Sequence, residues 1–281
     1  MNIQRILVPV DYSECSNRAL KYAISFAKRN RAKITVLHAY HMPVPVAEMT
    51  VTIDNSVIAE LEQEAHTQME QLIASHPGLQ EVLETTEVNL SLALDAIDTA
   101  IECDKIDLII MGTTGAHNLG DKLLGTNTYG VIKRATCPVL AVPENYNGND
   151  IKEVVFACDY KKITDFSAMD PLIAISQTYD MHLHLLHIDE QKQPIDTVEL
   201  FEGKKLDQYL KKVDHSFHVS SEKDIEEAIH KYVSDQDIDI LAVMPRKHSF
   251  FEGLTHKSIT KRMAHHSEVP LLVLHDRSIE V

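Results

Sequence analysis

Short runs of consecutive apolar residues alternate along the chain with segments whose apolar residues recur every three or four positions. In the first half we predict strands at 3–10, 33–40, about 82–90, 106–111 and 138–142. Helical spacing fills the gaps, as in 19–27 and again in 57–72. Because the strand runs are continuously apolar, both faces of the sheet should be covered by helices. The pattern therefore predicts a doubly wound, Rossmann-like α/β fold with a parallel sheet.

The second half of the chain repeats the landmarks of the first in the same order. Residues 106–111 match 238–243, and 137–142 match 269–274, both at an offset of 132 positions. Upstream, Ile34-Thr-Val-Leu-His38 resembles Leu183-His-Leu-Leu-His187. These repeats indicate an internal duplication. We expect two tandem domains, 1–145 and 150–281, joined by the polar segment 144–150 with its Asn147-Gly148 turn pair.

Composition and charge exclude several classes of protein. The 281 residues include 27 Lys and Arg against 42 Asp and Glu, a formal net charge of −15. Residues 1–145 hold 11 basic and 18 acidic side chains, so neither half is basic and a nucleic-acid partner is excluded. No apolar stretch approaches the ~20 residues that span a bilayer, so no membrane partner is expected.

The expected location is the cytoplasm. The first eleven residues reach an acidic side chain before a signal-peptide core could form. The cysteines are scattered without a Cys-x-x-Cys pair, which is typical of a reducing compartment. They are Cys15, Cys103, Cys137 and Cys158.

Glycines follow the buried strand 106–111 in a spacing that suits phosphate binding. Gly112 and Gly115 come first, and after nine intervening residues Gly125, Thr126 and Asn127 open the next helix. Glycine leaves no Cβ against a phosphate oxygen and adopts backbone angles closed to other residues. A helix N-terminus also favours an anion. With Asp11 at the end of the first strand to accept hydrogen bonds from ribose, these residues predict a nucleotide site.

This pattern resembles the ATP-binding subgroup of the universal stress proteins. The glycine spacing, the segment Val8-Pro-Val-Asp11, the strand end Leu37-His38 and Cys137-Pro-Val-Leu carry the resemblance. It covers the first half fully and the second in outline, and it implies a tandem protein with folds similar to adenine nucleotide alpha hydrolases. The implied function is an ATP-binding stress-response regulator, with Mg²⁺ or Mn²⁺ held mostly by phosphates and water and with a protein partner of unknown identity. The implied contacts are Pro9, Val10 and Asp11 with adenosine, Ala39 with the adenine edge, and Gly112, Thr113, Gly115, Gly125, Thr126 and Asn127 with the phosphates.

The second half departs from the glycine pattern. The offset of 132 puts Met244, Lys247 and Lys257 at the three glycine positions, and only Ser258 retains a hydroxyl. Three Cβ atoms there should obstruct a phosphate. We therefore expect that the second domain does not bind ATP in the manner of the family.

Other functions compete with this interpretation. An adenine-nucleotide-hydrolysing or adenylating enzyme would carry a Ser-Gly-Gly-like loop where this chain has Asp11-Tyr-Ser-Glu. P-loop and G-x-G-x-x-G signatures are absent, and no residue stands out as a catalytic base or metal ligand. A pure interaction module with two vestigial sites is the remaining alternative. Asp11 as a helix cap and Cys15 or Cys158 as a redox sensor also remain open.

The two domains should form a pseudo-twofold pair inside one chain. Exposed apolar strand edges are a liability, so the last strands, 139–142 and 271–274, are the natural edges to pair with each other. A larger homodimer would also be compatible with the sequence.

Overall fold

The structure is a computed structural model that describes residues 2–42, 55–113, 126–146, 151–157, 165–188, 197–222, 224–244 and 269–275. The strands are β1 (Arg5–Pro9), β2 (Lys33–Tyr40), β3 (Leu83–Leu90), β4 (Leu108–Thr113), β5 (Val139–Pro143), β6 (Glu153–Ala157), β7 (His182–Ile188), β8 (His215–Ser220), β9 (Ile240–Val243) and β10 (Leu271–Val273). The helices are α1 (Glu14–Asn30), α2 (Asn55–Ser75), α3 (Ala93–Asp104), α4 (Thr126–Arg134), α5 (Asp170–Tyr179), α6 (Thr197–Leu210) and α7 (Ile225–Asp235).

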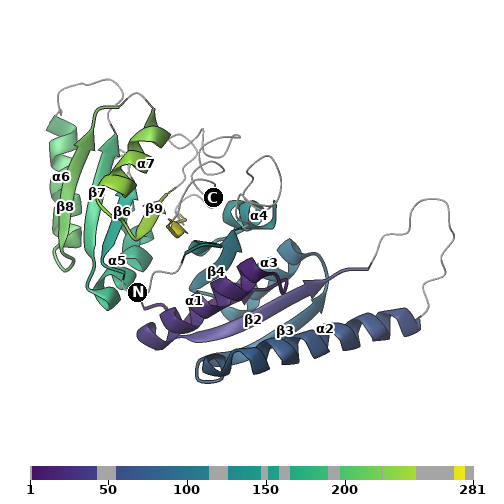
Figure 1. Ribbon diagram of the computed structural model, residues 1–281. Coiled ribbons are helices and arrows are strands. Elements are labelled where there is room, and N and C mark those ends of the chain that lie inside the picture. The colour runs from purple at the N-terminus through teal and green to yellow at the C-terminus, as the bar shows by residue number, and fades with distance from the viewer. Residues whose placement is uncertain are drawn as a thin grey trace.

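One sheet of ten strands runs through both halves, which lie side by side (Figure 1). Its order is β3-β2-β1-β4-β5-β10-β9-β6-β7-β8. Strands are parallel within each half, as predicted from the uninterrupted apolar runs. The halves meet through β5 and β10, which pair antiparallel. The expectation that the last strand of the first half pairs with the last strand of the second half is confirmed.

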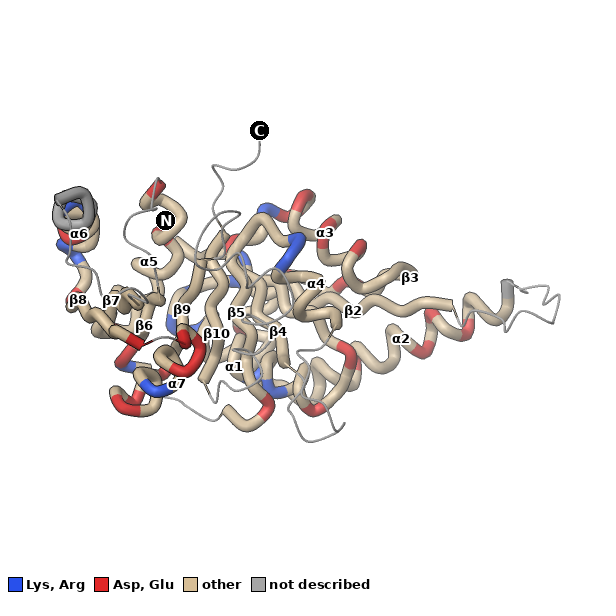
Figure 2. The backbone as a smooth tube through the Cα atoms, turned by 90° about the horizontal axis from the view of Figure 1, so that it is seen from above, with Lys and Arg blue, Asp and Glu red and all other residues tan. Residues whose placement is uncertain are grey.

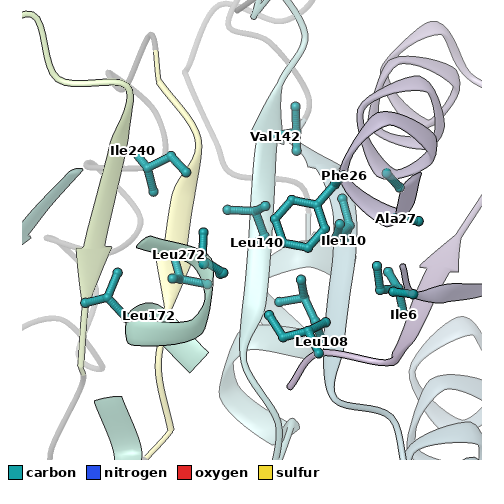
Figure 3. Packing of buried hydrophobic residues seen from close by; sticks show 14 of the residues in the cluster. Ile6, Phe26, Ala27, Leu108, Ile110, Leu140, Val142, Leu172, Ile240 and Leu272 are labelled. Atoms are coloured by element: carbon teal, nitrogen blue, oxygen red, sulfur yellow. The ribbon is translucent and has the colours of Figure 1, made fainter. Parts of the chain in front are cut away.

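Helices cover both faces of the sheet, and alternate strand residues point to each layer. Ile6, Leu108 and Leu140 lie in the core layer under α1, α2, α5 and α6. Their neighbours Leu7 and Ile109 lie in the layer under α3, α4 and α7. Figure 3 shows the first layer crossing the junction, with Phe26 of α1 beside Leu140. The hydrophobic core is therefore continuous between the two halves.

A matching aspartate anchors the first strand of each half. Asp107, just before β4, accepts hydrogen bonds at Oδ2 from the backbone N–H groups of Gln4 and Arg5, both at 2.9 Å. Asp239, 132 positions later, accepts the equivalent pair of hydrogen bonds at Oδ2, from the N–H groups of Lys152 and Glu153 at 2.7 and 2.9 Å. The duplication seen in the sequence therefore extends to individual hydrogen bonds.

Local sequence explains where α1 begins and ends. The Ser13 side chain caps it by accepting a hydrogen bond from the Ser16 N–H, and Glu14 in the first turn complements the helix dipole. At its other end Arg31 adopts a left-handed conformation, with φ of 55°, and its N–H binds the carbonyls of Ala27 and Lys28. The cap at Ser13 places the start of α1 directly beyond the end of β1, where the predicted site lies.

Candidate functional site

A cavity of about 630 Å³ opens at the carboxyl ends of β1, β2 and β4. The chain runs from β1 outward to β2 and β3, while β4 and β5 lie on the other side of β1, so the strand order reverses at this point. In parallel sheets such a crevice is the usual place for a ligand. The cavity is lined by Pro9, Val10, Asp11, Ser13, Cys15, Ser16, Leu37, Ala39, His41, Leu92, Ala93, Leu94, Asp95, Ile97, Met111, Gly112, Thr126, Asn127, Thr128 and Arg134.

The structure brings most of the predicted site residues together in this cavity. Those that line it are Pro9, Val10, Asp11, Ala39, Gly112, Thr126 and Asn127. Thr113 is buried behind it, with its hydroxyl directed to the carbonyl oxygen of Val142 at 3.5 Å. Gly115 and Gly125 lie outside the described residues. Residues from three strand ends and from the start of α4 thus share one crevice.

Asp11 supports the cap of α1 and also faces the crevice. Its Oδ1 accepts hydrogen bonds from the Ser13 hydroxyl at 2.6 Å and the Ser13 N–H at 3.1 Å. Burial raises the pKa of this carboxyl, but the hydrogen bonds from Ser13 and Ser16 outweigh burial, so the pKa is below its usual value. The interpretation of Asp11 as the helix cap is therefore wrong: Ser13 is the capping residue, and Asp11 orients it. The two hydrogen bonds from Ser13 both use Oδ1.

The backbone of Val10 is already engaged by β2. Its N–H donates to the carbonyl oxygen of Leu37 at 2.8 Å, and its own carbonyl oxygen accepts from His38 Nδ1 at 2.9 Å. The His38 ring packs against Tyr12, with centroids 4.4 Å apart. Tyr12 has a positive φ of 63°, which makes a sharp turn between β1 and α1. This turn fixes Asp11 at the mouth of the cavity.

Gly112 is required by the packing of the protein itself. A Cβ at this position would lie 2.5 Å from Cys15 Sγ and 2.7 Å from the Cys15 carbonyl oxygen. The φ of Gly112 is not in the left-handed region. The expectation that Gly112 serves through unusual backbone angles is therefore wrong. The glycine lets the first turn of α1 approach β4 closely.

Cys15 is a buried structural thiol rather than a reactive one. Its Sγ donates to the carbonyl oxygen of Thr113 at 2.7 Å. Burial, with the nearby charges of Glu144 and Asp11, raises its pKa to about 12. Because the thiolate is the reactive form, the structure disfavours Cys15 as a redox sensor. Cys158 lies outside the described residues.

Two interactions that the sequence did not indicate shape the wall formed by α3 and α4. Thr128 in the first turn of α4 donates from Oγ1 to the Gly112 carbonyl oxygen at 3.0 Å, which ties the helix to β4. Arg134 forms ion pairs with Asp95, at 3.2 Å, and with Asp98. Residues 95 and 134 both line the cavity, but their spacing matches no simple pattern in the sequence.

The equivalent position in the second half is filled by a side chain. Met244 corresponds to Gly112 and is buried in the core, with 4% of its surface exposed. The other positions compared between the halves, Lys247, Lys257 and Ser258, lie outside the described residues. Across the described ranges, no helix has the length and apolar character needed to cross a membrane.

Comparison with known proteins gives the family. The sequence model of the Universal stress protein family matches residues 2–143 and again residues 151–275. The chain therefore belongs to the universal stress protein family, with two copies of the family's domain in tandem. The resemblance inferred from the glycine motif is confirmed at the level of the family.

Individual relatives agree with this assignment. A universal stress protein of Methanocaldococcus jannaschii is 34% identical over 145 residues, which are 50% of this chain and 81% of the relative. A universal stress protein of Synechocystis is 24% identical and aligns over 96% of this chain and 99% of its own length. The crystal structure of a universal stress protein from Archaeoglobus fulgidus shares the fold, with a TM-score of 0.68, 20% identity and coverage of 96% of both chains.

Proposed function

We propose that the first half binds ATP or another adenine nucleotide, together with Mg²⁺ or Mn²⁺, and that nucleotide occupancy regulates a stress-response partner protein. The observation that carries this proposal is the cavity at the strand-order reversal, where seven residues of the predicted site meet. Its volume of about 630 Å³ lies in the range of small-molecule sites. The glycine spacing, which resembles that of the ATP-binding subgroup, supplies the class of ligand.

Each part of the cavity has a role in this proposal. Asp11 offers Oδ2 to the ribose hydroxyls, while its Oδ1 stays on the cap of α1. Ala39 at the end of β2 meets the adenine edge. The N-terminus of α4, at Thr126 and Asn127, faces the phosphates, because orphan N–H groups and the helix dipole favour negative charge. A divalent cation held by phosphates and water needs no dedicated protein cage.

Binding is favoured over turnover because the carboxylates that line the cavity already have partners. Asp11 accepts hydrogen bonds from Ser13, and Asp95 is paired with Arg134. The lowered pKa of the Asp11 carboxyl makes it a weak general base near neutral pH. A regulator that changes conformation or assembly with nucleotide occupancy agrees better with this arrangement than an efficient ATPase does.

Isothermal titration calorimetry with ATP and MgCl₂ tests the proposal on the full chain. We expect wild type to bind and Asp11→Asn to bind about tenfold more weakly, since asparagine still accepts from Ser13 but loses the charge offered to ribose. Asp235→Asn, at the exposed end of α7, removes one charge far from the cavity and should bind like wild type. Absence of binding by wild type, or equal affinities for all three proteins, would contradict the proposal.

A further inference from the structure

A second cavity, of about 930 Å³, runs along α1 on the face of the sheet that carries α2 and α5. It lies where the two halves and the connecting segment meet. We call it the α1 groove. It is lined by Glu14, Asn17, Arg18, Lys21, Tyr22, Ser25, Phe26, Arg29, Ser75, His76, Tyr146, Ile151 and Tyr179.

Three polar atoms in the walls of the α1 groove are buried without a hydrogen-bond partner. They are Tyr22 Oη, Tyr146 Oη and His76 Nε2. His76 as a whole is only 7% exposed. A buried polar atom without a partner costs about 1–3 kcal/mol, and native proteins contain few of them. Each of these atoms has almost no accessible surface, so a ligand in the groove meets the side chains around them and not the polar atoms themselves.

The hydrogen bonds of His76 define what its free nitrogen can do. Its Nδ1 lies 2.9 Å from the carbonyl oxygen of Leu72, which can only accept, so Nδ1 carries the proton. In the neutral ring Nε2 is then an acceptor.

Positive charge gathers along the groove although the chain as a whole is strongly acidic. The part of α1 that lines the groove carries three basic side chains, Arg18, Lys21 and Arg29, and one acidic side chain, Glu14 at the start of the helix. Asp239 lies near Tyr22 and Tyr146, and its Oδ2 is held by two backbone N–H groups. Figure 2 shows acidic positions spread over α2, α3 and α7 instead. The groove is thus a local site for an anion.

Aromatic rings form one wall of the groove and connect the two halves. The Tyr22 ring lies 5.9 Å from that of Tyr146 and 6.3 Å from that of Phe26, which in turn lies 5.7 Å from Tyr179. The guanidinium of Arg29 sits 4.4 Å above the Tyr179 ring. Burial raises the pKa of Tyr22 well above its usual value and that of Tyr146 to about 12. Both hydroxyls therefore remain protonated near neutral pH.

We propose that the α1 groove is a second ligand site, distinct from the crevice at the strand ends, and that it takes a small organic phosphate carrying an aromatic ring. The phosphate binds Lys21 and Arg29, since a guanidinium pairs with phosphate oxygens through two parallel hydrogen bonds. The ring packs on the half-buried faces of Tyr22 and Tyr146. A ligand there touches both halves and the segment between them, so it stabilises their mutual arrangement.

Titration of the full chain with phenyl phosphate, followed by ³¹P NMR, tests this proposal, with inorganic phosphate as the comparison. We expect phenyl phosphate to bind at least about tenfold more tightly than inorganic phosphate, because only the ester contacts the aromatic wall. Lys21→Gln and Arg29→Gln should each weaken binding about five- to tenfold. Arg29 is about 20 Å along α1 from the crevice, at 1.5 Å per residue, so its effect reports on the groove.

Two further variants complete the test. Lys133→Gln removes one exposed positive charge on α4, which packs on the opposite face of the sheet, and it should leave phenyl phosphate binding unchanged. Tyr22→Phe keeps the ring and removes only the buried, unpaired hydroxyl, so it should bind phenyl phosphate like wild type, and the melting temperature of the unliganded protein should stay the same or rise.

Several results would overturn the proposal. They are equal affinities for phenyl phosphate and inorganic phosphate, no binding of either, and equal weakening by Lys133→Gln and Arg29→Gln. Markedly weaker binding by Tyr22→Phe would also contradict it, because this variant keeps the ring face that the ligand is proposed to contact.

Discussion

Leu140 of β5 pairs directly with Leu272 of β10, its own counterpart in the duplicated sequence. On either side, Val139 pairs with Val273 and Ala141 with Leu271, so each half offers the same short segment to the other. This reciprocity is the signature of a twofold interface. The local twofold axis of the chain therefore passes between Leu140 and Leu272, both of which are fully buried.

Replacing these two leucines tests whether the junction stabilises the whole molecule. Leu140→Ala and Leu272→Ala should each lower the free energy of unfolding by about 2–5 kcal/mol, because each leaves a cavity in the shared core. The double variant should deviate from additivity by about 0.5–3 kcal/mol, since the side chains belong to one cluster. Urea unfolding followed by circular dichroism measures these values. Strict additivity would show that the two halves are energetically separate.

Gly112→Ala tests the close approach of α1 to β4. The added methyl group meets the backbone carbonyl of Cys15 as well as its sulfur, so we expect a loss of about 1–3 kcal/mol in unfolding free energy. Removing the sulfur as well, with Cys15→Ala in the Gly112→Ala protein, should not restore the lost stability fully, because the backbone carbonyl of Cys15 remains. Gly203→Ala is the matched control, because residue 203 lies within α6 and a Cβ there would have no atom within 4 Å. That variant should gain about 0.5–1 kcal/mol, and a loss of similar size in both proteins would refute the packing argument.

A network of histidines lies beneath α7 in the second half. His184 Nε2 contacts Glu153 at 2.7 Å, and its Nδ1 contacts the Tyr232 hydroxyl at 2.8 Å. The neighbouring His182 contacts Asp214 at 2.8 Å and shares the Ser216 hydroxyl with His218. Burial, together with the nearby charges of His184 and His182, lowers the pKa of His218 below its ordinary value of 6.5.

This lowered pKa predicts that the protein loses stability in mild acid. Below about pH 6.5 the unfolded chain binds a proton at residue 218 that the folded chain resists, so the free energy of unfolding should fall as the pH decreases. Burial lowers the pKa of His275 as well, which acts in the same direction. Urea titrations between about pH 5.5 and 7.5 measure the slope. The slope should be shallower in His218→Gln, and an unchanged slope would assign the effect to other groups.

Thiol labelling tests the structural role assigned to Cys15. Cys103 is exposed on α3, whereas Cys15 and Cys137 are buried. Ellman's reagent at neutral pH, with peptide mapping of the products, should modify Cys103 quickly and Cys15 only on unfolding, because burial keeps that thiol protonated. Cys103→Ser removes the fast phase. Rapid labelling of Cys15 in the folded protein would reopen its interpretation as a redox sensor.

Much of the fold could be predicted because it depends on periodicity and repetition. The segment 33–40 was predicted as a strand and is β2, and 138–142 matches β5 to within a residue at each end. The pairing of β5 with β10 followed from two apolar edges that had to be covered.

The parts that could not be predicted depend on contacts between residues far apart in the chain. The reason for Gly112 lies in Cys15, nearly a hundred positions earlier, and no local pattern links them. The ion pairs of Arg134 with α3 and the unpaired hydroxyls of Tyr22 and Tyr146 likewise arise only when helices pack. Sequence patterns therefore located the crevice, but they did not explain its glycine or indicate the α1 groove.

The most direct test of the proposed function is the number of ATP molecules bound per chain, measured by calorimetry with Mg²⁺ on wild type and on Gly115→Lys. This substitution places in the first half the residue found at the equivalent position, Lys247, of the second. We predict one site in wild type, through the first half, and its loss in the variant. Absence of binding in wild type, or a site that Gly115→Lys leaves intact, would contradict the assignment of the first half as the nucleotide-binding domain.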